Sequence, residues 1–364
     1  MTKDELYMMR CIELAKKAAG SVAPNPMVGA VLVHDGQIIA EGWHQRYGEA
    51  HAEVNCINQA MEKGYKDFIS LSTLYVSLEP CSHFGKTPPC SDLIIQHEIK
   101  KVVIGCRDPF KEVNGRGIEK LNATGVETNV GVLKEECIQL NKAFFTFHQQ
   151  HRPYIILKWA QTANGKIGKA PLGPPEGRKN TDSDVRRLLI SNEFTNKLVH
   201  KWRSEEASIL VGTNTALLDD PQLTNRYWQG KQPVRLVLDK DLKLPSTLQL
   251  FNHDAKTIIF NTKKHTDEGN VQYYQIASDE NAVYEIIKAI YQLQLQSVLV
   301  EGGAQLLKSF IDAGLWDEAR VIENSELKVE NGLNAPLLSN NQIIQEQIII
   351  NDKIRYYKNL TSSI

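Results

Sequence analysis

The sequence predicts an α/β protein built from two consecutive domains. Short apolar runs alternate with segments of helical periodicity along the 364 residues, and such alternation is typical of layered α/β domains. The alternation is interrupted at the polar stretch 148–153 (HQQHRP), which ends in proline. Because a domain commonly contains roughly 100–200 residues, we expect one domain over residues 1–148 and a second over residues 153–364.

In the N-terminal half, the elements are expected from apolar periodicity and from the turn residues between them. Asp35-Gly36 separates two apolar runs and supplies the positive φ that a tight hairpin turn needs. The helices are expected at residues 4–19, 51–61, 92–97 and 118–123. The strands are expected at residues 28–33, 38–40, 73–77, 102–104 and 126–130.

In the C-terminal half, short apolar runs again predict buried strands, and longer periodic segments predict helices. The strands are expected at residues 154–159, 208–211, 234–239, 257–261 and 297–300. The helices are expected at residues 183–203, 280–293 and 304–312. The end of the chain, residues 342–357, is expected to form two strands across a turn at Asn351-Asp352.

Composition excludes several classes of protein. A formal net charge of -1 argues against a broad electrostatic grip on nucleic acid, which needs clustered Lys and Arg. No apolar run approaches the roughly 20 residues of a membrane span, and the N-terminus lacks a signal peptide. We therefore expect a cytoplasmic protein without a nucleic-acid or membrane partner, and a homo-oligomer is compatible with the sequence. Four cysteines have apolar neighbours and are expected to be buried thiols: Cys11, Cys56, Cys106 and Cys137.

The other two cysteines belong to a set of residues that suits a zinc ion. His51-Ala52-Glu53 opens an expected helix, Cys81 follows an expected strand, and Cys90 lies beyond it in the same loop. One imidazole and two thiolates are typical zinc ligands, and three protein ligands leave a fourth position for water. Glu53 is placed to move a proton between that water and a leaving amine, as in zinc-dependent deaminases. His51, Cys81 and Cys90 are the predicted metal ligands, and Glu53 is the predicted catalytic residue.

A structural role for these cysteines is the alternative. Structural zinc sites have four protein ligands, and His83 is available as the fourth. Eight residues separate Cys81 from Cys90, whereas nucleobase deaminases usually carry Cys-x-x-Cys. The combination of His-x-Glu, a later Pro-Cys and a further cysteine favours the catalytic interpretation.

These motifs resemble a known family. The segment 80–90 (PCSHFGKTPPC), with residues 25–29 (NPMVG) upstream and residues 115–117 (GRG) downstream, resembles the bifunctional deaminase–reductase of riboflavin biosynthesis. The longer interval between the cysteines is normal in that family. The resemblance covers nearly the whole chain. It implies a cytidine-deaminase-like three-layer domain followed by an α/β domain folded like dihydrofolate reductase.

The resemblance also implies a substrate and two reactions. The first domain would use one zinc ion per chain to deaminate a 2,5-diamino-6-(ribosylamino)pyrimidinone 5′-phosphate hydrolytically. The second domain would then reduce the ribosyl group to ribityl with NADPH. By motif match, the contacts to the deaminase substrate are Asn25, His44, His83 and Lys86.

The second half carries its own matching motifs, at residues 158–167 (KWAQTANGKI), 200–203 (HKWR), 209–215 (ILVGTNT) and 219–226 (DDPQLTNR). Arginine presents a fork that fits phosphate oxygens. By the resemblance, the residues that face the reductase substrate are Arg203, Leu223, Arg226 and Glu301. Those that face the cofactor are Ala160, Thr215, Asp219 and Gly303.

The second half also contains a glycine pair and several residues that differ from the family pattern. Gly302-Gly303 joins an expected strand to a helix, where glycines let a diphosphate approach backbone N–H groups. G-x-G-x-x-G is absent, so an ordinary Rossmann fingerprint is not present. The family usually has Ser and Asp at the positions that Thr162 and Asn164 occupy here. It usually has a tryptophan where this chain has Lys179, and a Gly-Gly pair where this chain has Gly332-Leu333.

Three functional hypotheses follow. The leading one is a two-step enzyme of riboflavin biosynthesis acting on a phosphorylated small molecule. The second is a nucleic-acid base deaminase with a C-terminal recognition module, which the near-neutral charge and the lack of a basic stretch with interleaved aromatics disfavour. The third is a deaminase whose C-terminal half is degenerate and serves as a scaffold or dimerisation domain.

Overall fold

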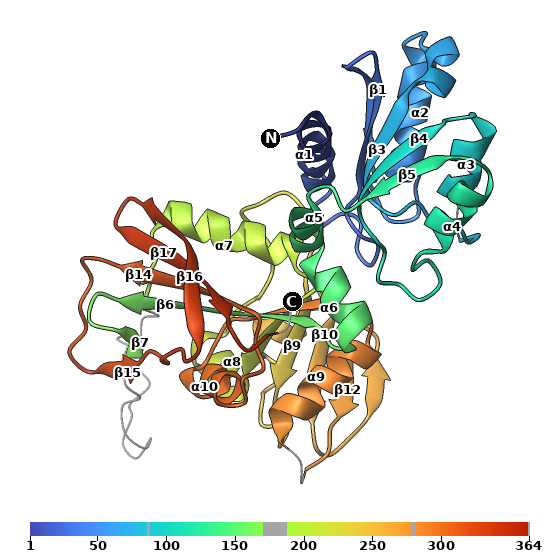
Figure 1. Cartoon of the computed structure of the whole chain (residues 1–364). Helices are drawn as coiled ribbons and strands as arrows, with labels where there is room; N and C mark the ends of the chain where they lie inside the picture. Colours follow the sequence, from blue (N-terminus) through green and yellow to red (C-terminus); the bar gives the residue numbers. More distant parts are fainter. Residues whose placement is uncertain (86–87, 170–187, 279–280, 363–364) are drawn as a thin grey trace, which may run out of the picture. The chain divides into compact units, whose positions relative to one another are not determined.

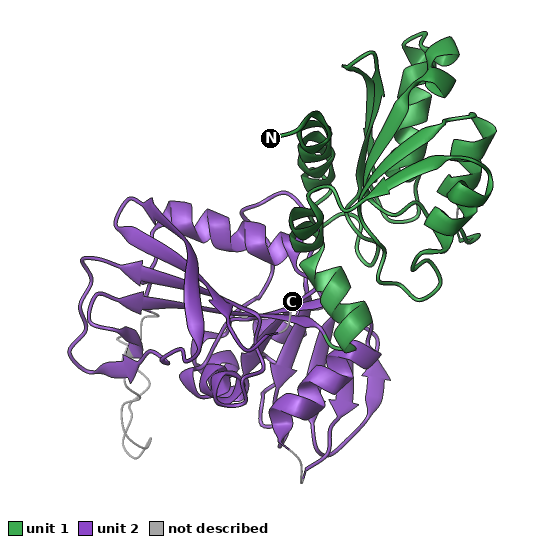
Figure 2. Ribbon diagram, in the orientation of Figure 1, with its two compact units in different colours: residues 1–152 green, residues 153–364 purple. Residues whose placement is uncertain are grey.

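The computed structural model describes residues 1–85, 88–169, 188–278 and 281–362. The chain divides into two compact units, Met1–Arg152 and Pro153–Ile364 (Figure 2). The polar stretch predicted to separate them is partly helical, because α6 (Lys142–Gln150) continues to Gln150. Among the described residues, no helix is long and apolar enough to cross a membrane.

The first unit is organised around a five-stranded sheet (Figure 1). The strand β1 pairs in an antiparallel manner with β2 and β3, whereas β3, β4 and β5 are parallel. Along the sheet the order is β2 (Gln37–Trp43), β1 (Gly29–His34), β3 (Thr73–Leu78), β4 (Lys101–Cys106) and β5 (Glu127–Val130).

Helices cover both faces of this sheet and make three layers. Successive residues of a strand point to opposite faces. Leu32 and Val76 therefore belong to one apolar cluster, while Val31 and Tyr75 belong to the other. The first cluster includes residues of α2 (Ala52–Glu62), α3 (Cys90–Gln96) and α4 (Arg116–Ala123). The second includes residues of α1 (Lys3–Lys16), α5 (Lys134–Leu140) and α6. The 3-10 helix η1 spans Lys66–Leu71.

The second unit has a ten-stranded sheet among its described residues, with the order β11-β12-β10-β9-β8-β13-β6-β14-β17-β16. Pairing is parallel from β12 to β14 and antiparallel at both ends. The strands are β6 (Tyr154–Thr162), β8 (Ser208–Gly212), β9 (Val234–Leu238), β10 (Thr257–Asn261), β11 (Thr266–Glu268), β12 (Val271–Gln275), β13 (Ser297–Val300), β14 (Glu318–Asn324), β16 (Asn341–Ile349) and β17 (Asp352–Asn359). A separate pair joins β7 (Lys166–Lys169) to β15 (Gly332–Asn334).

Helices also lie on both faces of this second sheet. Leu210 and Leu236 pack with α9 (Ala282–Gln292) and α10 (Ala304–Asp312). Val211 and Val237 belong to the opposite cluster, with residues of α8 (Thr213–Asp219) and the 3-10 helix η2 (Gln249–Phe251). The remaining helix in the described part of this unit is α7 (Glu193–Glu205).

The structure contains several elements that the sequence did not predict: α5, α6, α8, β7, β11, β12 and β15. The turn between β16 and β17 lies at Ile350-Asn351, one residue before the predicted position. Two further differences concern α7 and β14. The helix predicted over 183–203 begins at Glu193, because the side chain of Asn192 accepts the N–H of Thr195 and caps it. Residues 188–192 lie outside that helix, and 183–187 lie outside the described residues. The central strand β14 was not predicted, because its sequence EARVIEN contains charged residues. These charges are compensated inside the fold: Arg320 pairs with Glu318 and Glu206.

A close contact at the start of α4 fixes the chain around Pro80. The N–H of Gly117 donates to Glu79, and a Cβ added at Gly117 would lie 2.0 Å from the carbonyl oxygen of Pro80. Any larger residue must therefore displace the segment that carries Cys81.

Replacing Gly117 by alanine is expected to destabilise the protein by about 3 kcal/mol, because the new methyl group overpacks against backbone. Gly125→Ala is the matched control: Gly125 has a φ of +84° and nothing within 4 Å of an added Cβ, so only backbone strain of about 1 kcal/mol is expected. Calorimetric unfolding of both variants measures the difference. A thermal midpoint for Gly117→Ala equal to or above that of Gly125→Ala would contradict the close packing.

Candidate active sites

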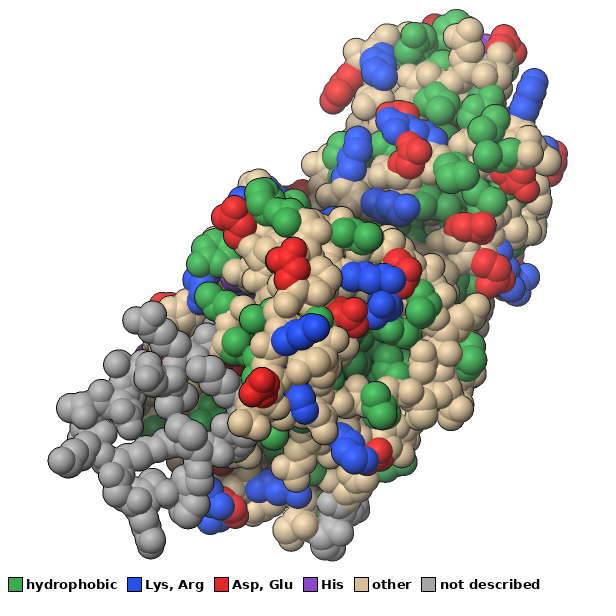
Figure 3. Space-filling model, turned by 90° about the vertical axis from the view of Figure 1, so that its left-hand side faces the viewer, with side chains coloured by type: hydrophobic (Ala, Val, Ile, Leu, Met, Phe, Trp, Pro, Cys, Tyr) green, Lys and Arg blue, Asp and Glu red, His purple; other side chains and the backbone are tan. Residues whose placement is uncertain are grey.

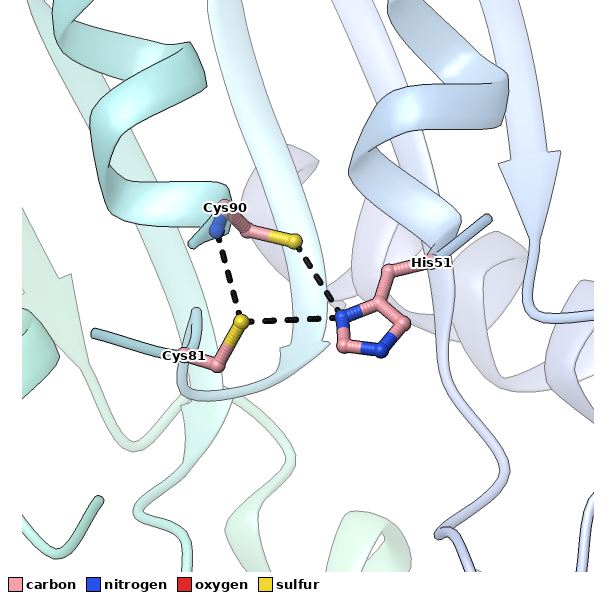
Figure 4. Close-up of side chains that lie close together, drawn as sticks. All are labelled: His51, Cys81 and Cys90. Carbon is pink, nitrogen blue, oxygen red and sulfur yellow. Dashed lines mark hydrogen bonds between the residues drawn. The ribbon is translucent and has the colours of Figure 1, made fainter. Parts of the chain in front are cut away.

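The three predicted metal ligands come together at one end of the first sheet (Figure 4). His51 is the N-cap of α2, Cys81 follows β3 by three residues, and Cys90 is the first residue of α3. The Nδ1 atom of His51 lies 3.6 Å from Cys81 Sγ and 3.3 Å from Cys90 Sγ. All three ligand atoms lie within 4.8 Å of one another.

This spacing fits a tetrahedral zinc ion. With Zn–S bonds of about 2.3 Å and Zn–N bonds of about 2.0–2.1 Å, sulfur and nitrogen ligands lie about 3.6 Å apart. The N–H of Cys90, at the start of α3, donates to Cys81 Sγ at 3.3 Å. The Cys90 thiol and the His51 ring also stabilise the Cys81 thiolate, and the pKa of Cys81 is lowered to about 4. A thiolate is the form that a metal binds.

Glu53 lies in the first turn of α2 and is 3 % exposed. Burial raises the pKa of its carboxyl group, and the neighbouring His51 ring opposes this rise. A carboxyl group with a raised pKa can both accept and return a proton near neutral pH. The helix that begins at His51, a candidate metal ligand, therefore also carries a carboxyl group suited to acid–base chemistry.

Two of the predicted substrate contacts meet each other beside the metal ligands. His44 Nδ1 donates to the carbonyl oxygen of Ala50 at 3.0 Å, and His44 Nε2 accepts from the Asn25 amide at 3.2 Å. Burial lowers the pKa of His44, which agrees with a neutral ring having one donor and one acceptor nitrogen. The rings of His44 and His51 lie 5.3 Å apart.

The other two predicted contacts lie in the loop between the cysteines. The His83 ring contacts Phe110 edge to face at 6.0 Å, and its buried Nδ1 lacks a hydrogen-bond partner in the described part of the chain. His83 does not join the group of possible metal ligands found among the described residues. Lys86 lies outside the described residues.

Glu79, which the sequence analysis did not select, fastens the loops around this site. Its buried carboxylate accepts the backbone N–H groups of Gly115 and Gly117 at 3.0 Å each, and those of Asp108 and Ile118 at 3.3 and 3.4 Å. A buried carboxylate needs such partners. The position of Glu79 two residues before Cys81 was the available signal, but its four partners become visible only in the folded chain.

In the second unit, two predicted substrate contacts bind each other. Arg203 Nε and Nη2 donate to the two carboxylate oxygens of Glu301 at 2.8 and 2.7 Å, and both side chains are buried. Burial alone would raise the pKa of Glu301, but Arg203 and Lys158 lower it to about 2. Lys158 Nζ, 3.6 Å from Glu301, was missed because it lies within an expected buried strand.

Two of the predicted cofactor contacts also meet. Thr215, on α8, lies beside the glycine turn after β13: a Cβ added at Gly303 would approach Thr215 Oγ1 to 3.1 Å. Gly303 has φ 44° and ψ 138°, a backbone conformation that residues other than glycine rarely adopt. Asp219 ends the same helix as Thr215, and Ala160 lies near the end of β6.

The remaining predicted substrate contacts share the segment after α8. Leu223 is buried with a φ of 53°, and Arg226 is exposed. The backbone N–H of Arg226 donates to His200 Nδ1 at 2.9 Å, and the Arg226 guanidinium donates to Gln222 Oε1.

The structure accounts for one departure from the family pattern. Asn164 lies in the turn after β6, where its side chain accepts the N–H of Val329 and donates to the carbonyl oxygen of the same residue. Thr162 Oγ1 donates to Asn164 Oδ1 at 2.7 Å. These two residues brace the turn with neutral hydrogen bonds. Gly332-Leu333 begins β15, and Lys179 lies outside the described residues.

Comparisons with known proteins agree with this geometry. Residues 1–106 match the family model of the cytidine and deoxycytidylate deaminase zinc-binding region, and residues 153–325 match that of the RibD C-terminal domain. The riboflavin biosynthesis protein RibD of Aquifex aeolicus is 40 % identical over 321 residues, which cover 86 % of this chain and 85 % of the relative. The chain belongs to the RibD family. It is a bifunctional enzyme of riboflavin biosynthesis, with a deaminase and a reductase domain.

Further relatives confirm the predicted fold class. RibD of Escherichia coli is 33 % identical over 333 residues, covering 87 % of this chain and 86 % of the relative. The crystal structure of a diaminohydroxyphosphoribosylaminopyrimidine deaminase/5-amino-6-(5-phosphoribosylamino)uracil reductase from Thermotoga maritima has a TM-score of 0.84 at 35 % identity, covering 98 % of this chain and 99 % of that one. The chain thus combines a cytidine-deaminase-like domain with a dihydrofolate-reductase-like domain. The hypothesis of a degenerate C-terminal scaffold is not supported.

The ion pair of Glu301 predicts a pH-dependent contribution to stability. Because folding lowers the pKa of Glu301 from its ordinary value of 4.5 to about 2, this contribution is present above pH 4.5 and is lost as the pH falls towards 2. Relative to Glu301→Gln, the native chain should lose about 3 kcal/mol of unfolding free energy across that interval. Urea titrations followed by tryptophan fluorescence measure it, since four of the five tryptophans lie beyond residue 153.

Glu193→Gln is the control for this titration, because Glu193 is an exposed acid at the start of α7. The difference in unfolding free energy between Glu193→Gln and the native chain should vary little with pH. Suppose that the difference in unfolding free energy between Glu301→Gln and the native chain stayed constant from pH 6 to pH 2. This result would show that the Arg203–Glu301 pair does not hold the carboxylate in its charged form.

Proposed function

We propose that the first unit hydrolytically deaminates a 2,5-diamino-6-(ribosylamino)pyrimidinone 5′-phosphate, and that the second unit then reduces the ribosyl group to ribityl with NADPH. The observation that carries the proposal is the convergence of His51, Cys81 and Cys90 with a buried Glu53 beside them. Family membership supports the pairing of this centre with a reductase domain.

The metal centre is proposed to hold one zinc ion per chain through His51, Cys81 and Cys90. Zinc at such a site lowers the pKa of its bound water towards about 7. Glu53 accepts the proton of the attacking water and delivers it to the departing amine. A catalytic role is favoured over a four-ligand structural site because His83 does not join the ligand group found among the described residues.

The pyrimidine substrate is proposed to contact Asn25, His44, His83 and Lys86. Asn25 and His44 already support each other through a hydrogen bond, so their polar atoms are held in place before the substrate binds. The buried Nδ1 of His83 has no hydrogen-bond partner among the described residues, and a polar group of the bound substrate would supply one. Lys86 adds a positive charge for an anionic group.

The reductase substrate is proposed to contact Arg203, Leu223, Arg226 and Glu301. NADPH would supply a hydride to the sugar carbon that bears the amine, and its contacts would be Ala160, Thr215, Asp219 and Gly303. The Arg203–Glu301 pair holds the carboxylate in a fixed direction through two parallel hydrogen bonds. The glycines of this turn would let a phosphate group approach the backbone N–H groups at the start of α10.

A small-molecule substrate also agrees with the surface. On the face that Figure 3 shows, the described basic and acidic side chains are interspersed, rather than gathered in a patch of one sign. Nucleic-acid binding ordinarily needs a basic surface. We propose an enzyme that acts in the cytoplasm, where free thiols such as Cys81 and Cys90 stay reduced, and that works without a nucleic-acid or membrane partner. A homo-oligomer agrees equally well with this proposal.

Glu53→Gln is expected to slow ammonia release by about a thousandfold, because general acid–base catalysis contributes about 10²–10⁴-fold. NADPH oxidation with the deaminated intermediate should be unchanged. A coupled assay that follows ammonia and NADPH separately measures both. Ammonia release at the native rate would refute the role of Glu53.

Two further variants separate the role of Glu53 from metal binding and from a general effect of a substitution on α2. Glu62→Gln, at the exposed far end of α2, should retain both activities. Zinc measured by atomic absorption should remain at one ion per chain in Glu53→Gln but fall in Cys90→Ser, since Cys90 is one of the three proposed ligands and Glu53 is not. A full zinc content in Cys90→Ser would overturn the proposed ligand set.

Gly303→Ala is expected to raise the KM for NADPH about tenfold, because the added methyl group faces Thr215 and strains the turn. Ammonia release should be unaffected. Gly314→Ala is the matched control, since Gly314 also has a positive φ of 66° but nothing within 4 Å of an added Cβ. Equal NADPH KM values for the two variants would exclude the glycine turn from the cofactor site.

A further inference from the structure

The segment from Thr224 to Gly230 lies along one face of helix α7. Three side chains of the helix contact the segment: His200, with Arg203 three residues and Ser204 four residues after it. Arg203 Nη1 donates to the carbonyl oxygen of Thr224 at 3.2 Å, and His200 Nδ1 accepts the N–H of Arg226 at 2.9 Å. A Cβ added at Gly230 would lie 2.8 Å from Ser204 Cβ. The helix is therefore a platform for this segment.

His200 is held in one protonation and one tautomeric state. Its side chain is 1 % exposed, and the ring of Tyr227 contacts it edge to face at 4.6 Å. Burial, with Arg203 and Arg226 close by, lowers the pKa of His200 to about 4. The ring is therefore neutral at pH 7. Because Nδ1 accepts the N–H of Arg226, the ring proton lies on Nε2.

The hydrogen bond to His200 fixes the backbone from which the Arg226 side chain extends. That side chain is exposed, contacts Gln222 Oε1, and lies 5.7 Å from the centre of the Tyr227 ring. A long exposed arginine loses rotamer entropy when a ligand immobilises it. A fixed backbone and two neighbouring contacts reduce the number of positions that its guanidinium can occupy.

We propose that His200 is a positioning residue of the reductase site, which fixes the backbone of Arg226 and thereby directs the Arg226 guanidinium to the substrate phosphate. This inference rests on the proposed function, in which Arg226 contacts the phosphorylated substrate. It adds a residue that acts through Arg226 rather than on the substrate. A direct contact between His200 Nε2–H and the substrate is the competing role.

Two conservative variants separate these roles. In His200→Asn, Oδ1 replaces the accepting Nδ1, and the Nε2–H donor is lost. In His200→Gln, an amide group occupies the Nε2 position, and the acceptor at Nδ1 is lost. With the deaminated phosphorylated intermediate, His200→Asn should keep KM within about threefold of the native value. His200→Gln should raise KM about tenfold, the effect of about one lost hydrogen bond, with kcat changed less than threefold. The reverse order would overturn the proposal in favour of direct contact.

The dephosphorylated intermediate tests whether the effect passes through the phosphate. His200→Gln should lower kcat/KM about tenfold for the phosphorylated substrate and leave kcat/KM for the dephosphorylated one unchanged. Equal losses with both substrates would show a general defect of the fold and overturn the proposal. Ammonia release by the same full-length chain serves as the control for the first unit.

Combining substitutions tests the dependence on Arg226. Arg226→Gln alone should raise KM for the phosphorylated intermediate; an unchanged KM would refute the proposed function of Arg226 itself. Adding His200→Gln to Arg226→Gln should raise KM by less than twofold, because the side chain that His200 directs is already absent. If His200→Gln still raised KM tenfold in this background, the positioning role would be wrong while the function of Arg226 would stand.

Discussion

Parallel strand pairing places the candidate sites of both units at the carboxyl ends of neighbouring strands. In the first unit β3 pairs with β4, so Glu79, Cys81 and Asp108 follow strand ends that lie side by side. In the second unit β13 pairs with both β6 and β8, which places Glu301 and Thr215 beyond adjacent strands. Ligand sites of open α/β sheets occur at this edge because the connecting loops meet there.

Buried carboxylates then stabilise the loops that leave these strand ends. Glu79 binds backbone N–H groups from the segment between β4 and α4, and Glu301 binds the guanidinium of Arg203 on α7. In each case a charged group without partners would be costly inside the protein. Because each buried carboxylate must keep its hydrogen-bond partners, the loops that carry those partners are held in one arrangement. The groups proposed to supply the chemistry in each unit lie next to these anchors: the candidate metal ligands next to Glu79, and the proposed cofactor and substrate contacts next to Glu301.

Sequence reasoning worked best where the signal is local. Most expected strands were found near their predicted limits, because period-two and apolar-run patterns record which residues are buried. It failed at β14, where Arg320 pairs with Glu318 of the same strand and with Glu206, a residue far away in the sequence. It also did not predict α5, α6, α8, β7, β11, β12 and β15. It placed the start of α7 too early, because the Asn192 cap lies within an otherwise periodic stretch. At Asn164, where the family usually has Asp, the sequence could not show that the side chain braces a turn through two hydrogen bonds to the backbone of Val329.

The sequence by itself determined the family to which both halves belong, and which residue types form the candidate sites: one histidine and two cysteines, with a glutamate two residues after the histidine. These features depend on residue identity and short spacing, which a linear chain records directly. Tertiary structure alone decided the pairings of Asn25 with His44, Glu301 with Arg203, and His200 with the backbone of Arg226. Such contacts depend on strand order and helix packing, which join residues that are distant along the chain. Local periodicity shows which residues are buried, but it does not show which distant residue each of them contacts.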